Sequence, residues 1–438
     1  MSLPRYPRYK DSGIAWMGRL PEHWGTSRLK NLFTLMKRAP EEGDEIVTAF
    51  RDGQVTLRSN RRVDGFTNAV HEHGYQRVRA GDLVIHAMDA FAGAIGVSDS
   101  DGKSTPVYSV CTPTHPVVYS QYYGRLLRHM ALTGYINSLS KGIRERSTEF
   151  RWNEASEVVV AVPELPEQVA IASFLEHETA KIDALVAEQE RLIELLKEKR
   201  QSVISHAVTK GLNPDVPMKE SGIEWLGEVP AHWQAKRLKQ VSMKLTDGEH
   251  ISPSLSTEGV ALLSAKDVRD RTIDYDVDKF VSAIDAIAFW RRCKPERGDV
   301  LVVSRGATVG RVGLVTEDID FCLMGSVILC KPTNGYSSEF LYYVLNAKHS
   351  QMSLWFSSAS SAQQAIYIRD VAEVPFAVPP IEEREAIVAF LDSETSKIET
   401  LTAEAQRAIE LLQERRTALI SAAVTGQIDV REAAGRAA

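Results

Sequence analysis

Two stretches of the chain repeat apolar residues at alternating spacings of three and four. The first runs from Pro166 to Gly211 and the second from Pro380 to Gly426, with matching residues such as Phe174 and Phe390 lying 216 positions apart. A 3,4 spacing places apolar side chains on one stripe of an α-helix, and about 42 helical residues span roughly 63 Å, more than an ordinary core is wide. The pattern therefore predicts two long helices that pair as a coiled coil.

The order of segments predicts that the two helices run antiparallel, because the first leads away from one globular stretch and the second leads back toward it. This pairing would bring Glu178 toward Arg415 and Glu394 toward Lys199. We expect the outer face of the pair to be the dock for a catalytic partner. The residues predicted to pack the helices together are Leu175, Ile182, Leu185, Leu192, Leu196, Leu391, Ile398, Leu401, Leu412 and Leu419.

Short apolar runs separated by Gly, Asp and Asn fill the segments before each helix and predict β-rich globules. Residues 11–30 recur at 220–239, so that Trp24 corresponds to Trp233, and the run Gly81–Val84 resembles Gly298–Leu301. The predicted fold class is α+β, with two pseudo-symmetric mixed α/β domains joined by two long helices. The expected domains are 1–165 (first globule), 166–212 (central helix), 213–380 (second globule), 381–426 (C-terminal helix) and 427–438 (a flexible tail).

Composition is that of an ordinary soluble protein, with 44% hydrophobic and 25% charged residues. No apolar run is long enough to span a bilayer and the N-terminus lacks a signal-peptide pattern, which predicts a cytoplasmic location. The four cysteines have no CxxC spacing and favour free thiols. The net charge is −6, so binding to nucleic acid would require the positive charge to gather on one face.

Catalytic motifs do not emerge from the sequence. His71 and His73 lack a third metal ligand nearby, and no metal site is expected. The turn at 89–93 faintly resembles a glycine turn for S-adenosylmethionine, but the box with which an adenine methyltransferase holds a flipped base is missing. The GATVG run at 306–310 lacks the Lys-Ser/Thr pair of a phosphate-binding loop. The chain is therefore predicted to be non-catalytic.

Basic clusters in the globules favour DNA binding, because Arg both neutralises phosphate and reads guanine edges, whereas Gln reads adenine. The alternative for each cluster is a solvated face of an acidic protein. The candidate DNA-binding residues are Arg58, Arg61, Arg62, Arg77, Arg79, Lys141, Arg144, Arg146, Lys266, Arg269, Arg271, Arg305, Gln363 and Gln364.

The repeated motifs resemble the specificity subunits of type I restriction–modification systems. The resemblance is carried by YKDSGIAWMGRLPEHW and its second copy KESGIEWLGEVPAHW, by the junctions VPELPEQVAIASFL and VPPIEEREAIVAFL, and by the helix ends ISHAVTKG and ISAAVTGQ. It implies two target recognition domains that each bind half of a split double-stranded DNA target, with the helix pair setting the spacer.

The resemblance also implies partners: two modification subunits, which carry S-adenosylmethionine and methylate adenine, and restriction (translocase-nuclease) subunits that can join them. No cofactor is expected in this chain. Two alternatives stay open, namely a coiled-coil scaffold that binds protein, and a specificity subunit of a modification-only methyltransferase. A stand-alone methyltransferase is disfavoured by the missing catalytic box.

Overall fold

The computed structural model describes residues 3–14, 16–61, 64, 73–139, 149–224, 226–251, 254–359 and 365–434. These residues form two compact units. Unit 1 comprises Met1–Gln189 with Arg407–Ala438, and unit 2 comprises Glu190–Gln406. Each unit therefore contains one β-rich domain and parts of both long helices, α4 (Leu165–Lys210) and α9 (Ile381–Val424). The predicted α+β class is confirmed.

The elements of unit 1, besides the long helices, are β1 (Tyr9–Asp11), β2 (Arg19–Pro21), β3 (Gly25–Arg28), η1 (Leu29–Asn31), β4 (Phe33–Leu35), β5 (Val47–Ala49), β6 (Val55–Leu57), η2 (Arg58–Asn60), β7 (Gln76–Val78), β8 (Leu83–His86), η3 (Ala90–Ala92), β9 (Ile95–Val97), β10 (Gly102–Ser104), β11 (Tyr108–Pro113), α1 (Ser120–Leu132), α2 (Tyr135–Leu139), α3 (Trp152–Ala155), β12 (Val159–Val162) and α10 (Arg431–Ala434). Those of unit 2 are β13 (Met218–Glu220), β14 (Glu228–Pro230), β15 (Gln234–Arg237), η5 (Leu238–Gln240), β16 (Ser242–Asp247), β17 (Val260–Leu263), β18 (Phe280–Val281), α5 (Ala283–Arg292), β19 (Val300–Val303), β20 (Val312–Leu314), β21 (Phe321–Leu323), β22 (Val327–Pro332), α6 (Ser338–Asn346), α7 (Lys348–Ala359), α8 (Ile368–Ala372) and β23 (Pro375–Val378).

Each unit is built on a four-stranded antiparallel sheet of the same topology, ordered β4-β11-β8-β9 in unit 1 and β16-β22-β19-β20 in unit 2. Strand β19 is apolar throughout because both its faces are covered. Val300 and Val302 join the core with α6, whereas Leu301 and Val303 join a second core with β21. This explains why the sequence shows continuous apolar runs here, where a half-exposed strand would alternate.

The sheet strands begin with the repeated Gly-Asp pair for a structural reason. The Asp82 carboxylate accepts the Arg79 N–H at 2.8 Å, and the Asp299 carboxylate accepts the Glu296 N–H at 2.7 Å. Each Asp therefore closes the turn that feeds the central strand, and both are buried. The motif shared by the two copies is a turn-forming device, which explains its recurrence without any role in chemistry.

The repeated tryptophans anchor each domain to the start of a long helix. In unit 1 the Glu167 carboxylate accepts hydrogen bonds from Trp24 Nε1 at 2.9 Å and Tyr6 Oη at 2.6 Å, and it contacts His23 Nε2 at 3.0 Å. Glu383 occupies the matching place in unit 2. Both glutamates lie in the first helical turn, where the helix dipole favours negative charge.

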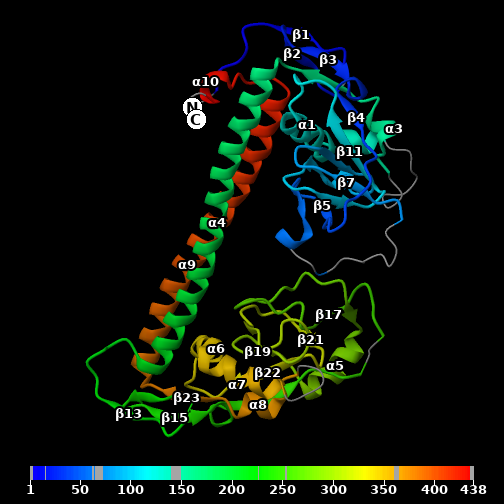
Figure 1. The fold of residues 1–438 in the computed structure, drawn as a ribbon. Helices are drawn as coiled ribbons and strands as arrows, with labels where there is room; N and C mark the ends of the chain where they lie inside the picture. Colours follow the sequence, from blue (N-terminus) through cyan, green and yellow to red (C-terminus); the bar gives the residue numbers. More distant parts are fainter. Residues whose placement is uncertain are drawn as a thin grey trace. The chain divides into compact units, whose positions relative to one another are not determined.

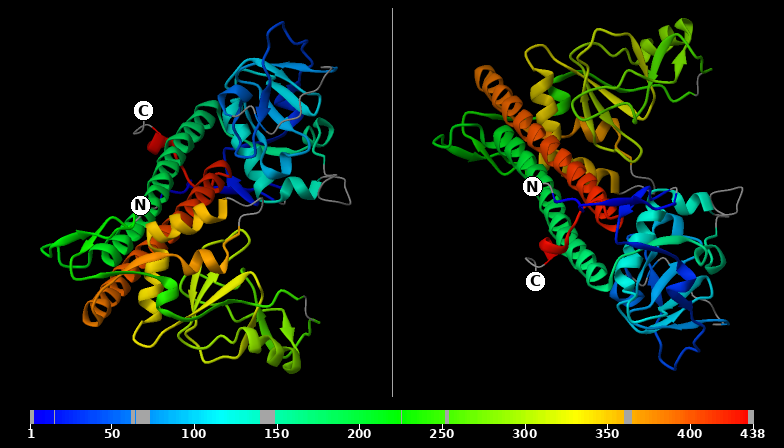
Figure 2. Two further views of the ribbon diagram at one scale, coloured as in Figure 1. Left: turned by 90° about the horizontal axis from the view of Figure 1, so that it is seen from below. Right: turned by 90° about the horizontal axis from the view of Figure 1, so that it is seen from above.

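The long helices pack together side by side (Figures 1 and 2). Within unit 1 the first part of α4 packs with the last part of α9, and within unit 2 the reverse holds, so the pairing is antiparallel as predicted. Of the predicted packing residues, Leu175, Ile182, Leu196, Leu391 and Ile398 are buried and Leu412 and Leu419 are partly buried.

Leu185, Leu192 and Leu401 were predicted to pack between the helices and are instead 44%, 40% and 47% exposed. The less exposed stripe between Ile182 and Leu196 runs through Val186, Gln189 and Ile193. The apolar residues Leu192 and Ile193 are adjacent, as are Leu185 and Val186, so the one-dimensional pattern fits two stripes about 100° apart. Packing selects the stripe that keeps the heptad spacing unbroken.

The ion pair that joins the helices in unit 1 is Arg416–Asp183, with Nε and Oδ1 2.8 Å apart. The predicted partner of Arg415, Glu178, pairs instead with Lys181 on its own helix at 2.8 Å. In unit 2 Glu394 likewise pairs with Lys397 at 2.7 Å, although Lys199 also helps to hold the Glu394 pKa low. The predicted partnership of Glu178 with Arg415 was therefore wrong, whereas the predicted approach of Glu394 to Lys199 and the antiparallel direction were right.

The segment after α9 packs onto unit 1 and does not extend away from it as the predicted tail. Val430 is fully buried, the Asp429 N–H donates to the Pro4 carbonyl at 2.8 Å, and the Arg431 guanidinium lies 5.2 Å from the centre of the Tyr6 ring. The prediction of a flexible tail is thus wrong for residues 427–434.

Candidate nucleic-acid interface

In unit 2, the turn after β19 lies beside the chain that enters α8. Arg305 forms an antiparallel bridge with Ala365, and the Ile366 N–H donates to the Ser304 carbonyl at 2.9 Å. A hollow of about 560 Å³ opens at this place and is lined by Arg305, Tyr367 and Arg369 among others. Arg305 is exposed, so its guanidinium is available to solvent.

An exposed aromatic ring and a second arginine complete this edge of unit 2. Tyr367 is 44% exposed, and the Arg369 guanidinium lies 5.5 Å from the centre of its ring. The ring helps to orient the planar guanidinium, whose Nε also lies 3.6 Å from an Asp370 oxygen. Arginine and tyrosine in a surface hollow are suited to phosphate and base-edge contacts.

The matching turn of unit 1 has the same backbone connection. The Phe150 N–H donates to the Ala87 carbonyl at 2.9 Å, as Ile366 does to Ser304. The hollow beside this turn has a volume of about 700 Å³, and its lining includes Arg51, Arg58 and Arg61. Both domains therefore carry arginines beside this turn, although the hollows that these arginines line are built from different segments.

Histidine and carboxylates give the unit 1 hollow mixed polarity. Burial lowers the pKa of His86, which leaves the ring neutral at pH 7, and its Nδ1 accepts the Asp89 N–H at 3.0 Å. The ring proton is consequently on Nε2, which can donate to an acceptor. Asp52 pairs with Arg61 at 2.7 Å and Asp89 with Arg51 at 2.9 Å. Such exposed pairs contribute little to stability and exchange readily for other partners.

Four other predicted DNA-binding residues have partners within their own unit. Arg77 is 14% exposed and pairs with Glu41, Lys266 lies 3.2 Å from Asp278, and Arg269 lies 2.9 Å from Asp274. Arg271 pairs with Asp392 of α9 at 2.6 Å and contacts Tyr343 Oη at 3.0 Å, which ties the domain to the helix. These contacts favour a structural role for Arg77 and Arg271.

Arg79 is exposed on the turn before β8, away from the hollow that Arg58 and Arg61 line. Among the candidates, the structure thus brings Arg58 and Arg61 together beside the turn of unit 1 and places Arg305 in the turn of unit 2. The remaining candidates fall outside the described residues: Arg62, Lys141, Arg144, Arg146, Gln363 and Gln364.

Arg51, Tyr367 and Arg369 line these hollows and were missed from the sequence. Arg51 directly precedes the Asp52-Gly53 turn, a position that exposes a side chain, and this signal could have identified it. Tyr367 and Arg369 carry no comparable local signal, because only the bridge between Arg305 and Ala365 brings them to the turn.

Metal and thiol chemistry are not evident in the part of the chain that the structure describes. No group of three or more His, Cys, Asp or Glu side chains is placed there to hold a metal ion. All four cysteines are buried free thiols, and burial raises the pKa of Cys293 and Cys322 to about 12 and that of Cys330 to about 11. These thiols remain protonated at neutral pH and act as core residues. Among the described helices, none is long and apolar enough to cross a membrane.

Comparison with known proteins gives a consistent result. Residues 263–411 match the type I restriction modification DNA specificity domain. The chain is 20% identical over 434 residues to the type I restriction enzyme EcoKI specificity subunit of Escherichia coli strain K12, which covers 94% of this chain and 90% of that protein. It is 23% identical over 321 residues to the EcoBI specificity subunit of Escherichia coli, which covers 71% of this chain and 67% of that one.

Solved structures show the same fold. A chain from a structural study of complex assembly and conformational transition in the type I R-M system superposes with a TM-score of 0.72 at 18% identity, over 92% of this chain and 98% of that chain. The HsdS subunit from Thermoanaerobacter tengcongensis gives a TM-score of 0.57 at 18% identity, over 93% and 98%.

Two β-rich domains of one topology and two long packed helices form the fold that this chain shares with these solved structures. The match to the DNA specificity domain and the coverage of whole specificity subunits make the class definite. The chain belongs to the specificity subunits of type I restriction–modification systems, which confirms the family resemblance and the predicted non-catalytic role.

Proposed function

We propose that the chain reads a split double-stranded DNA target, with one half-site bound by the domain of each unit. The observation that carries this proposal is the doubled sheet: the same backbone turn, at residues 87–88 and 304–305, follows the matching strand of both domains and exposes its second residue. Different side chains at matching positions, Met88 in one copy and Arg305 in the other, suit two domains that read different bases.

The chain's acidity does not oppose this role. Arg305 is exposed at the hollow of unit 2, whereas the charges of Arg369, Arg269 and Lys266 each have a neighbouring aspartate. Positive charge is thus locally available although the protein carries a net charge of −6. Because each phosphate contact releases counterions, affinity for DNA will fall steeply with salt.

The helix pair is proposed to set the spacer between the half-sites. Support comes from the matched stripes of α4 and α9: Ile182, Leu196 and Ile398 are all buried. A heptad repeated without interruption makes a stiff pair whose length changes in fixed increments of about 1.5 Å per residue. We likewise propose the boundaries 1–165 and 213–380 for the two target recognition domains.

Modification subunits are the proposed catalytic partners. They would carry S-adenosylmethionine, with no cofactor in this chain, and restriction subunits could join the assembly. A related structure concerns the assembly of such a complex. Several large apolar side chains remain exposed on the long helices and would suit a protein partner; they are Leu185, Leu192, Leu195, Leu401 and Leu411. Because its target would be chromosomal DNA, we propose that the complex works in the cytoplasm.

Exchange of one domain tests the proposal. Residues 213–380 are replaced by the corresponding domain of another specificity subunit, and the sites methylated by the complete complex are mapped. We expect one half-site to change while the other half-site and the spacer stay the same. Exchange of residues 1–165 is the matched control and should change the other half-site only. Changes in both half-sites after a single exchange would contradict independent reading.

A coiled-coil scaffold that binds only proteins is the alternative function. It predicts that the complete complex methylates the same sites whichever domain is exchanged. The same purified complex also distinguishes a modification-only system from a restriction system. It is incubated with unmodified DNA that carries the mapped site, and only a restriction complex cuts this DNA.

A further inference from the structure

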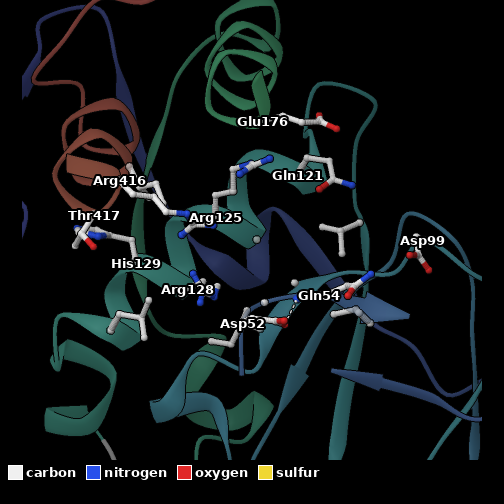
Figure 3. A pocket seen from close by; sticks show the side chains of 18 of the residues that line it. Asp52, Gln54, Asp99, Gln121, Arg125, Arg128, His129, Glu176, Arg416 and Thr417 are labelled. Carbon is white, nitrogen blue, oxygen red and sulfur yellow. Dashed lines mark hydrogen bonds between the residues drawn. The ribbon is translucent and has the colours of Figure 1, made fainter. Parts of the chain in front are cut away.

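Unit 1 contains a cavity of about 460 Å³, distinct from the hollow that Arg58 and Arg61 line. Helix α1 forms one wall, the turn between β5 and β6 together with β9 forms another, and segments of α4 and α9 that belong to unit 1 close it. Figure 3 shows Arg125, Arg128 and Arg416 around this space, with Arg125 reaching toward the side of Gln121 and Glu176. Three arginine side chains therefore line one cavity.

Among the described residues, two of these arginines, Arg125 and Arg128, lack a bound carboxylate, whereas Arg416 is paired with Asp183. Burial lowers the pKa of both Arg125 and Arg128, and the nearby charge of Arg416 lowers each further. The Nε atoms of Arg125 and Arg128 are buried without a hydrogen-bond partner. Within the described part of the chain, neither residue forms an ion pair. Two unpaired like charges in a half-buried space oppose folding unless something of negative charge is bound beside them.

Three carboxylates line the cavity, Asp52, Asp99 and Glu176, but none of them forms an ion pair with Arg125 or Arg128 in the described part of the chain. Asp52 pairs with Arg61 at 2.7 Å, and Asp183 takes Nε and Nη2 of Arg416 at 2.8 and 3.3 Å. Glu176 favours the charged form of Arg125 and Asp52 that of Arg128, each without reaching ion-pair distance. Arg125 and Arg128 therefore remain without a directly bound carboxylate among the residues that the structure describes.

The backbone around Arg128 is shaped to admit this side chain. Gly53 has a φ of +90°, and a Cβ atom placed there would lie 2.4 Å from Arg128 Cδ. Any residue other than glycine would thus push the arginine out of the cavity and strain the turn as well. The Arg128 Nη2 also donates to the Arg51 carbonyl at 3.2 Å, which holds the guanidinium in position.

The matching place in unit 2 provides an internal comparison. Arg200, which lies 216 positions before Arg416, pairs there with Asp270 at 3.0 Å and contacts Tyr342 Oη at 3.1 Å. Asp392, which matches Glu176, is bound by Arg271 at 2.6 Å. Unit 2 therefore neutralises this place with its own carboxylates, whereas unit 1 surrounds it with additional arginines and leaves a cavity.

We propose that this cavity in unit 1 binds a phosphate group, carried by an organic molecule about the size of a mononucleotide. Arginine forks match phosphate oxygens and form charge-assisted hydrogen bonds with them. Gln54 and Gln121 add amide donors, while Val97, Leu132 and Ile420 provide apolar lining for the rest of the ligand. The volume lies within the range of about 300–1,000 Å³ that is usual for small-molecule sites. This inference does not depend on the proposed function.

Calorimetric titration of the full chain with pyrophosphate and with adenosine monophosphate tests the site. We expect one-site binding that weakens at least tenfold in the double variant R125Q/R128Q. Arg191→Gln, an exposed arginine on α4 with no role in the cavity, is the matched control and should leave the affinity unchanged. Equal affinities in all three proteins would overturn the proposal.

Thermal unfolding of the wild-type chain with and without pyrophosphate is a second test, and its first part needs no variant. Pyrophosphate should raise the midpoint of unfolding of the wild-type chain, because a ligand of the folded state stabilises it. Without ligand, R125Q/R128Q should unfold at an equal or higher temperature, since the mutual repulsion of the arginines is relieved. A lower midpoint for the variant, together with no effect of pyrophosphate on the wild type, would mean that the arginines are only structural.

The phosphate could also come from the DNA backbone, and a third titration separates this source. A short duplex of arbitrary sequence is bound to the same three proteins. If the free phosphates do not bind but duplex affinity falls at least tenfold in R125Q/R128Q alone, the site binds the DNA backbone and the proposal of a small organic phosphate is overturned. If neither the free phosphates nor the duplex responds to the double substitution, no phosphate binds at this site and the proposal fails.

Discussion

The matched glutamates at the start of the two long helices allow a stability prediction with its own control. Glu167 is 5% exposed and Glu383 is 43% exposed, yet both accept the indole N–H of the repeated tryptophan. Replacing each with alanine removes the same atoms from equivalent positions. The cost should differ because water can reach only one of the two sites.

The magnitude follows from the groups that lose their acceptor. In Glu167→Ala, Trp24 Nε1 and Tyr6 Oη lose contacts of 2.9 and 2.6 Å, and both side chains are buried. An unsatisfied buried polar group costs about 1–3 kcal/mol, so the two together destabilise unit 1 by about 2–6 kcal/mol. In Glu383→Ala, water can replace the lost carboxylate at Trp233, and the expected loss is about 1 kcal/mol.

Hydrogen exchange read by mass spectrometry resolves the two units within one full-length chain. Peptides from α1 report on unit 1, and peptides from α6 report on unit 2. We expect Glu167→Ala to speed exchange in the α1 peptides by at least about thirtyfold, and Glu383→Ala to speed it in the α6 peptides by about fivefold. Equal accelerations by the two substitutions would refute the reasoning from burial.

Three further predictions concern DNA binding, pH and the helix pair. Replacing Arg305 or Arg369 with Gln should weaken DNA binding by the complete complex about tenfold. In titrations at several salt concentrations, the slope of log affinity against log salt concentration should become less negative by about one. An unchanged slope would exclude a phosphate contact. Burial lowers the pKa of His349 to about 4, so below pH 6.5 the unfolded chain binds a proton at this residue and the folded chain does not. The free energy of unfolding of unit 2 should therefore fall by up to about 3 kcal/mol between pH 6.5 and pH 4. Urea unfolding should not show this fall in the variant His349→Gln. Replacing Asp183 with Asn should destabilise unit 1 by about 0.5–1 kcal/mol, because Arg416 loses its partner on the other helix; urea unfolding that is unchanged in this variant would show that the pair contributes nothing.

The repeats allowed the fold to be predicted in outline. The constant offsets between matching residues predicted two copies of one unit, and the 3,4 spacing of apolar residues predicted two long paired helices. Their exact stripe was not predictable, because Leu192 and Ile193 are adjacent and either could face the partner. Burial of Ile182 and Leu196 with Ile193 between them decides it, and this requires knowing where the other helix lies.

The candidate interface was less accessible to prediction. The sequence does not reveal whether an arginine side chain faces solvent or pairs with a carboxylate of the same domain. Arg271 pairs with Asp392, which lies 121 residues later, and Arg77 pairs with Glu41 across a turn of the domain. Arg305 stays exposed. Only the tertiary structure separates these cases, since the partners are distant in the sequence.

Arg125 and Arg128 were also overlooked, although a signal existed. They lie three residues apart and therefore share one face of a helix, and Leu126 and Leu127 between them are fully buried. Two arginines on the face beside a buried stripe indicate a charged site close to the core. Recognising the cavity still required the turn at Gly53 and the end of α9, which no local pattern connects with α1.

The central claim is that this chain alone determines which split DNA sequence its complex recognises. Mapping methylated adenines across the source genome, before and after deletion of the gene for this chain, tests it most directly. The account predicts that one two-part motif with a spacer of constant length loses its methylation completely and regains it when the gene is restored. Persistence of every methylated motif after deletion, or loss of an uninterrupted motif, would contradict it.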